Sequence, residues 1–192
     1  MNLLQSLRRG LFPHGWASAV VLYVFILFFA IGILVHRDYG VSADEPAVRK
    51  FGIDAFDYLF HGGSVPTQLD WSFFNPAFTV FLRGLELALD LNDGADIWFM
   101  RHLATFVLFF LGIVAFYHIA RIRFQNWKLP LLGSVMFMLS PRLFAHGFYN
   151  PKDVPALFLF TFSVWTLLIF LERRNWWTLI VHTLLTALRS VP

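Results

Sequence analysis

The chain has 192 residues, of which 58% are hydrophobic and only 14% are charged. A soluble domain has about a quarter of its residues charged, so this composition argues against a soluble protein and indicates a membrane protein. The basic residues are scattered between apolar runs, which argues against nucleic acid as a partner. Because the sequence has no cysteine, disulfides, thiolate metal sites and cysteine nucleophiles are excluded.

Five apolar segments predict an all-α, polytopic transmembrane helix bundle of four to five spans, forming a single membrane domain over 1–192. The first is free of charge over 20 residues, about the length that crosses a bilayer at 1.5 Å per residue. No small-residue cleavage site follows it, which favours an uncleaved anchor over a signal peptide. The last is expected to be incomplete or interfacial. The predicted spans are 16–35, 101–120, 129–147, 155–171 and 176–190.

Basic residues predict the orientation of these spans, because short cytoplasmic loops carry an excess of Lys and Arg. The bases fall before the first span and in alternate loops, at Arg8, Arg9, Arg121, Arg123, Lys128, Arg173 and Arg174. This pattern predicts a cytoplasmic N-terminus. The large loop 36–96 and the segment 141–154 are then exoplasmic.

The loop 36–96 has ten acidic and four basic residues, a formal charge of −6. Two helical patterns predict that it folds as two amphipathic surface helices. A turn is predicted over 61–66, and the aromatic stretch 70–76 should enter the second helix at interfacial depth. The apolar positions are Phe51, Ala55, Tyr58 and Leu59 in the first pattern, and Phe78, Phe81, Leu82, Leu85 and Leu89 in the second.

Two adjacent acids, Asp44 and Glu45, lie just outside the first span and precede Pro46. The structural interpretation is a helix start, because Asp is a favoured N-cap and Pro is tolerated in the first turn. The functional interpretation is a general base or a metal ligand at the membrane surface. Both remain open from the residue types alone, with the structural one favoured.

The segment 140–155 (SPRLFAHGFYNPKDVP) lies on the same predicted side of the membrane. It is longer and more polar than a tight connection requires. Asp153 could be an N-cap, and Arg142 and Lys152 could extend to lipid headgroups. Equally, the two cations could bind a phosphate, because ionisable groups at membrane depth usually have a functional reason. Arg101 and His102, at the start of the second span, are interpreted as snorkelling to the interface.

With these motifs, the chain resembles the GT-C membrane glycosyltransferases, and more narrowly the bacterial relatives of protein O-mannosyltransferases and of the aminoarabinose lipid A transferase. The resemblance rests on the Asp44–Glu45 pair opening a large loop, on two surface helices, and on the segments 97–103 (IWFMRHL) and 140–155. It covers nearly the whole chain but only the N-terminal portion of such a fold. A truncated or inactive form is therefore one expectation.

The resemblance implies transfer of a sugar from a polyprenyl-phosphate donor to an exoplasmic lipid, glycan or protein, in a bacterial inner membrane. It implies catalytic roles for Asp44 as general base, Glu45 as its support and Asp153 as a second acid. No metal site is predicted, although the cofactor requirement stays open and Asp153 could share a divalent metal. The implied substrate-binding residues are Arg142, Lys152, Arg101, His146 and Asn150.

Two other functions are weighed against this one. The chain could be a non-catalytic membrane remnant or subunit with a partner membrane subunit. It could also be a transporter module, but transporters hold their acids near the bilayer midplane, whereas these lie outside the spans.

Overall fold

The computed structural model describes residues 15–63, 76–92, 94–124 and 126–190, and these fold into helices alone. This result confirms the predicted all-α class. The helices, in chain order, are α2 (Trp16–Val35), α3 (Glu45–His61), α4 (Ala77–Ala88), α5 (Gly94–Arg123), α6 (Lys128–Met138), α7 (Pro141–Tyr149), α8 (Asp153–Arg173) and α9 (Trp176–Ser190).

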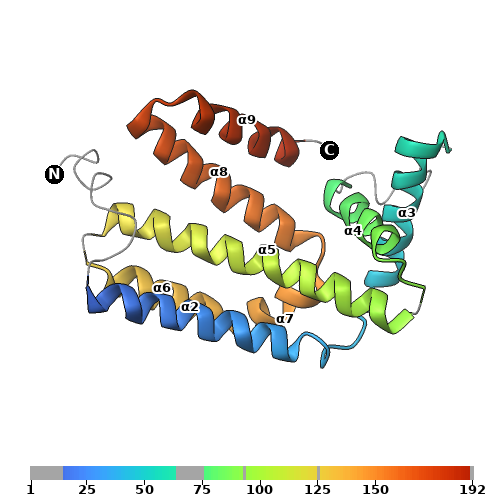
Figure 1. The fold of residues 1–192 in the computed structure, drawn as a ribbon, viewed down its shortest axis with the longest axis horizontal. Coiled ribbons are helices and arrows are strands. Elements are labelled where there is room, and N and C mark those ends of the chain that lie inside the picture. Colours follow the sequence, from blue (N-terminus) through green and yellow to red (C-terminus); the bar gives the residue numbers. More distant parts are fainter. Residues whose placement is uncertain (1–14, 64–75, 93, 125, 191–192) are drawn as a thin grey trace.

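Helix α5 is the centre of the structure (Figure 1). It packs against α2, α6, α7 and α8, while α9 packs on the outer side of α8. Helices α3 and α4 pack against each other and lie beyond one end of this bundle. With 30 residues, α5 is about 45 Å long, which exceeds the roughly 30 Å hydrocarbon core. It can therefore cross a bilayer and still reach α3 and α4.

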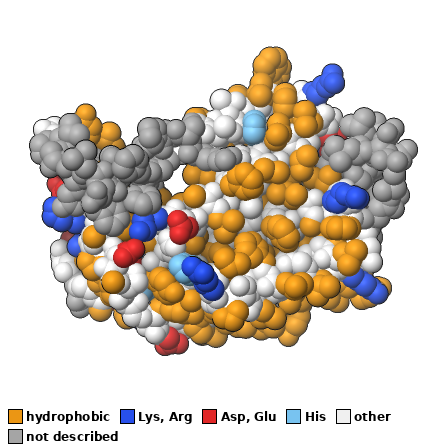
Figure 2. All heavy atoms as spheres, turned by 180° about the vertical axis from the view of Figure 1, so that it is seen from behind, with side chains coloured by type: hydrophobic (Ala, Val, Ile, Leu, Met, Phe, Trp, Pro, Cys, Tyr) orange, Lys and Arg blue, Asp and Glu red, His pale blue; other side chains and the backbone are white. Residues whose placement is uncertain are grey.

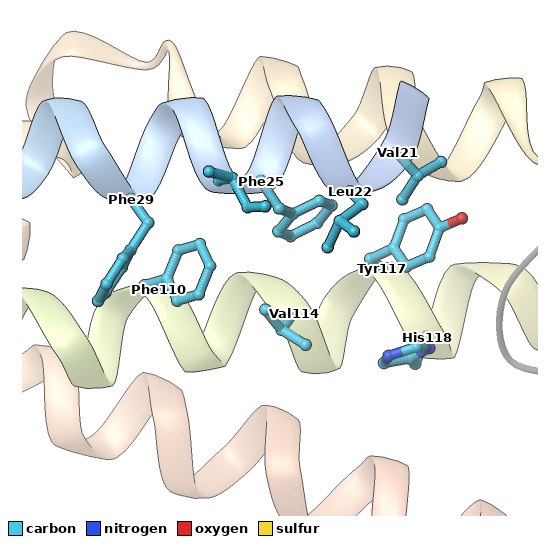
Figure 3. Close-up of a pocket in the computed structure, with 9 residues that line it drawn as sticks. Val21, Leu22, Phe25, Phe29, Phe110, Val114, Tyr117 and His118 are labelled. Carbon is cyan, nitrogen blue, oxygen red and sulfur yellow. The ribbon is translucent and has the colours of Figure 1, made fainter. Parts of the chain in front are cut away.

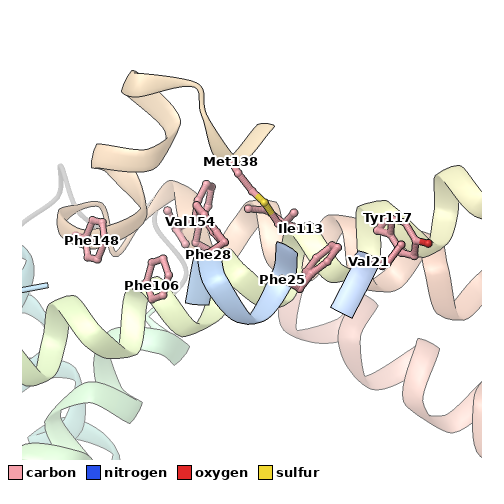
Figure 4. Packing of buried hydrophobic residues seen from close by; sticks show 10 residues of the cluster. Val21, Phe25, Phe28, Phe106, Ile113, Tyr117, Met138, Phe148 and Val154 are labelled. Carbon is pink, nitrogen blue, oxygen red and sulfur yellow. The ribbon is translucent and has the colours of Figure 1, made fainter. Parts of the chain in front are cut away.

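Aromatic rings form much of the buried core between α2, α5 and α7 (Figure 4). The rings of Phe106 and Phe148 stack nearly parallel, with centroids 4.9 Å apart. Phe106 also lies directly against Gly32 of α2, where any side chain would overlap its ring. Close packing of this kind holds apolar helices together where hydrocarbon offers no hydrophobic driving force.

Three helices, α2, α5 and α8, are long and apolar enough to cross a membrane. The predicted span 129–147 is instead a broken pair, because α6 and α7 meet at an angle of 65° and count as a fourth span only together. Pro141 explains the break, since Ser140 before it adopts an extended conformation and ends the helical path. Helix α9 has 15 residues, about 22 Å, and does not qualify as a span.

The two helices predicted in the loop 36–96 are present as α3 and α4. Helix α3 ends where predicted, with Gly62 in a left-handed conformation at φ 69°. The rest of the predicted turn and the stretch 70–75 lie outside the described residues. Phe81 and Leu89, on the predicted apolar face of the second helix, are exposed, as they would be on a helix lying at a membrane surface. The face of α4 that is buried in the protein carries Thr79, Leu82 and Glu86, and Glu86 forms the ion pairs described below.

Figure 2 shows hydrophobic side chains across the middle of one face, with most of the visible acidic side chains toward one end. The exposed apolar residues include Leu22, Ile26 and Ile31 on α2 and Leu167 and Leu171 on α8. An apolar surface of this extent is typical of helices that contact lipid. It is consistent with a protein integral to a membrane.

The contact between α3 and α4 depends on Gly52. A Cβ added there would lie 2.8 Å from the backbone oxygen of Thr79, so Gly52→Ala should force the two helices apart. We expect this variant to lower the free energy of unfolding by about 1–3 kcal/mol. Gly84→Ala is the matched control, because its nearest neighbour would be a Phe56 ring carbon at 3.8 Å. Thermal unfolding in detergent, followed by circular dichroism, compares the two. Equal stabilities would contradict the expectation.

Candidate functional site

Two of the segments singled out in the sequence meet in the structure, through Asp44 and Lys152. The Lys152 ammonium donates to the Asp44 carboxylate at 3.0 Å, across a separation of 108 residues. Asp44 is the N-cap residue of α3, yet its side chain makes no capping hydrogen bond. The side chain remains 67% exposed, whereas that of Lys152 is mostly buried. The Asp44 carboxylate is therefore accessible to a molecule from solvent.

Glu45, the second acid of the pair, points inward and is buried. One carboxylate oxygen pairs with Nε2 of His102 at 3.0 Å, and the other accepts the backbone N–H of Ser42 at 2.7 Å. With both oxygens engaged inside the protein, Glu45 can hold the turn before α3. Direct contact with a substrate would require this arrangement to open.

Asn150 organises the turn between α7 and α8. Its side-chain oxygen accepts the backbone N–H of Asp153 at 2.9 Å, so Asn150 provides the cap that Asp153 was expected to provide. Its amide nitrogen donates to the Asp153 carboxylate at 2.8 Å and lies 2.8 Å from Nδ1 of His146. These bonds fix Asp153 and His146 relative to each other. The N-cap interpretation of Asp153 was therefore wrong, because Lys152 is the N-cap residue of α8 and Asp153 is the first residue of the helix.

A cavity of about 280 Å³ lies beside this turn and is lined by four of the predicted site residues. A larger apolar groove of about 480 Å³ adjoins it, since Leu143 and Leu157 line both. The two spaces together have a polar head and an apolar extension between α6 and α8. Such a shape suits an amphiphile with a charged headgroup. The polar lining residues are Arg142, His146, Asn150 and Asp153.

A second apolar groove, of about 300 Å³, lies between α2 and α5 (Figure 3). Phe25, Phe29 and Phe110 line it, and Tyr117 and His118 lie toward one end. No Asp, Glu, Lys or Arg side chain is among its lining residues. The groove can accommodate a lipid chain, but it lacks the acids and cations of the other cavity.

Arg101 lies apart from the cavity, in a cluster of three arginines around Glu86. Its Nη1 donates to one Glu86 oxygen at 3.0 Å. Arg49 forms two bonds of 3.0 Å to the same carboxylate, and Arg83 a further one at 3.1 Å. The snorkelling interpretation of Arg101 and His102 was wrong, because both are buried and paired with acids of α4 and α3. Together they attach α3 and α4 to the end of α5.

The arginines determine the ionisation of Glu86. Burial alone would raise its pKa, but hydrogen bonds from Arg49 and the charge of Arg101 outweigh it, so the pKa lies below its ordinary value of 4.5. A lowered carboxyl pKa stabilises the folded state above the unfolded pKa, and this contribution is lost as the pH falls through the folded value. We therefore expect stability to decline below pH 4.5. Unfolding midpoints measured at several pH values should fall less steeply with decreasing pH for Glu86→Gln than for wild type. Parallel curves for the two proteins would contradict this expectation.

Among the described residues, no three His, Asp or Glu side chains lie close enough to bind a metal ion together. Comparison with protein-family models, curated proteins and solved structures finds no match for this chain. What the chain does must therefore be inferred from its site geometry and from the motifs of its sequence.

Proposed function

We propose that this chain is a membrane glycosyltransferase of the GT-C type, which transfers a sugar from a polyprenyl-phosphate donor to an exoplasmic acceptor. The observation that carries the proposal is the ion pair between Asp44 and Lys152, 3.0 Å long and 108 residues apart in sequence. It joins the two segments on which the resemblance to that family chiefly rests. An exposed carboxylate beside an ammonium group is a suitable arrangement for activating a hydroxyl next to a phosphate leaving group.

In the proposed reaction, Asp44 removes the proton from the acceptor hydroxyl or amine. The acceptor oxygen or nitrogen then forms a bond to the anomeric carbon, and the bond from that carbon to the phosphate oxygen breaks. The polyprenyl phosphate leaves with the bonding electrons, so negative charge develops on its oxygen. Lys152 and Arg142 would stabilise this charge, as preorganised cations stabilise developing anions in other enzymes.

The amphiphilic shape of the cavity supports a lipid-linked donor. Arg142 and His146 line its polar head, where a phosphate would find hydrogen-bond donors. The adjoining groove is lined by apolar residues of α5, α6 and α8, including Phe116, Met136 and Phe160. A polyprenyl chain could extend along this groove toward the lipid. Asp153, at the wall of the cavity, would orient the acceptor as a second acid.

The proposed orientation puts the cytoplasm at the end of the bundle where α2 begins and α5 and α8 end (Figure 1). That end carries Arg121, Arg123, Arg173 and Arg174 near the helix termini. The opposite end, with α3 and α4, would face the periplasm of a bacterial inner membrane. This polarity follows the excess of cytoplasmic Lys and Arg in membrane proteins.

A transfer assay tests the proposal. Membranes containing the full chain are incubated with a panel of polyprenyl-phosphate sugars carrying a radiolabel, and label is followed into lipid, glycan and protein fractions. We expect transfer from at least one donor, above that of membranes without the chain. Absence of transfer from every donor would favour the non-catalytic subunit, and ion flux from reconstituted chain would favour the transporter.

A further inference from the structure

Glu45 and His102 make a buried contact between α3 and α5. They are 57 residues apart in sequence, and the Glu45 oxygen lies 3.0 Å from Nε2 of His102. Their side chains are 2% and 0% exposed, so the contact is shielded from water. A hydrogen bond to a buried carboxylate is stronger than one on the surface, and losing it leaves an uncompensated polar group.

The same Glu45 carboxylate closes the turn that contains Asp44. Its second oxygen accepts the backbone N–H of Ser42 at 2.7 Å, while the backbone N–H of Glu45 donates to the backbone carbonyl oxygen of Ser42 at 3.2 Å. These two bonds close the turn over residues 42–45. Asp44 lies between the two bonded residues, so its backbone position depends on how Glu45 is held.

We propose that His102 is a positioning residue for Asp44, acting through Glu45. This inference rests on the proposed function, in which Asp44 is the general base. His102 anchors the turn to the long central helix α5, and the turn then presents Asp44 to Lys152. A displacement of about 1 Å at a reacting group can cost about 100-fold in rate, so such an anchor matters for turnover.

The contacts of His102 indicate an anchoring role beyond filling space. Its Nε2 faces the Glu45 carboxylate, whereas its Nδ1 has no hydrogen-bond partner among the described residues. Nε2 is therefore the ring nitrogen that is placed to donate to the carboxylate. One donor at the Nε2 position is therefore the property that a replacement must retain.

Two amide variants of different length test the proposal. The amide nitrogen of Gln can occupy the place of Nε2, whereas that of Asn reaches only the place of Nδ1. We expect His102→Gln to keep at least about a third of the wild-type kcat. His102→Asn should lower kcat by about 10- to 100-fold, with little change in KM for the donor. The double variant Glu45→Gln/His102→Asn should be no slower than the slower single variant, because both changes break the same contact.

A distance measurement tests the anchor without any need for transfer activity. Because the chain has no cysteine, Ala43→Cys and Ala156→Cys can carry two spin labels on exposed positions of the turn and of α8. Pulsed dipolar spectroscopy should give a narrow distance distribution in wild type and in His102→Gln, and a broad one in His102→Asn.

The two readouts separate the possible failures. An unchanged distribution and kcat in His102→Asn would overturn the positioning role. If His102→Asn does not fold, a broad distribution in a folded His102→Gln would also overturn it, and a narrow one would support it. If wild type transfers no sugar, the proposed function fails, yet the distance distributions still decide whether His102 positions the turn.

Discussion

Asp44→Asn is expected to reduce sugar transfer by at least about 100-fold, the lower figure for the loss of a general base. Asparagine has nearly the same volume but cannot accept the proton of the acceptor. The Asp44 side chain is 67% exposed, and the asparagine side-chain oxygen can still accept a hydrogen bond from Lys152. Turnover should therefore fall while the unfolding midpoint stays close to that of wild type. The measurement is the initial rate of label transfer at saturating donor.

Asp54→Asn is the matched control for this variant. Asp54 lies on α3, the helix that Asp44 precedes, and pairs with Lys50 at 3.2 Å within that helix. It is not among the residues that line the cavity. We expect its transfer rate to match that of wild type. Lys152→Gln should slow transfer as well, because the leaving phosphate would lose a stabilising cation. Near-normal transfer by Asp44→Asn would remove the basis for the proposed mechanism.

Glu86→Ala is expected to lower the free energy of unfolding by about 3–5 kcal/mol, the usual effect of removing one member of a buried ion pair. Glu86 is fully buried and accepts hydrogen bonds from three arginines. Its loss would remove the ion-pair partner of Arg101, which is itself only 2% exposed. The α3–α4 pair should then detach from α5 before the rest of the bundle unfolds. Chemical unfolding of the detergent-solubilised chain measures the change.

Asp54→Ala provides the control for stability. Its exposed pair with Lys50 should contribute at most about 0.5 kcal/mol, because surface ion pairs within a helix are weak. Glu86→Gln keeps the side-chain volume and one acceptor oxygen, so its free energy of unfolding should lie between those of wild type and Glu86→Ala. Equal unfolding free energies for Glu86→Ala and Asp54→Ala would show that the arginine cluster does not hold α3 and α4 in place.

The charged residues that attach α3 and α4 to α5 were difficult to predict from the sequence. Arg49 and Arg83 lie within amphipathic patterns, where a charge is most often exposed. Glu86 follows Arg83 at i+3, a spacing that suggests a local surface pair. The available signal was Arg101 and His102 together at the start of an apolar span, because two ionisable groups there need partners. Identifying those partners requires knowing which helices pack together.

The sequence by itself determined the helical class and the presence of the three long apolar helices α2, α5 and α8, because these depend on local composition and periodicity. It did not predict that α5 begins at Gly94, within the predicted loop 36–96. It also indicated that 41–46 and 140–155 are unusual for membrane-protein connections. Only the tertiary structure decided that Asp44 meets Lys152 and that Glu45 turns inward to His102. The first contact joins residues that are 108 positions apart in the sequence, and the second joins residues that are 57 positions apart. Such contacts depend on helix packing, which no local pattern encodes. Packing thus separates the two adjacent acids at the start of the loop, leaving the Asp44 carboxylate exposed and the Glu45 carboxylate buried.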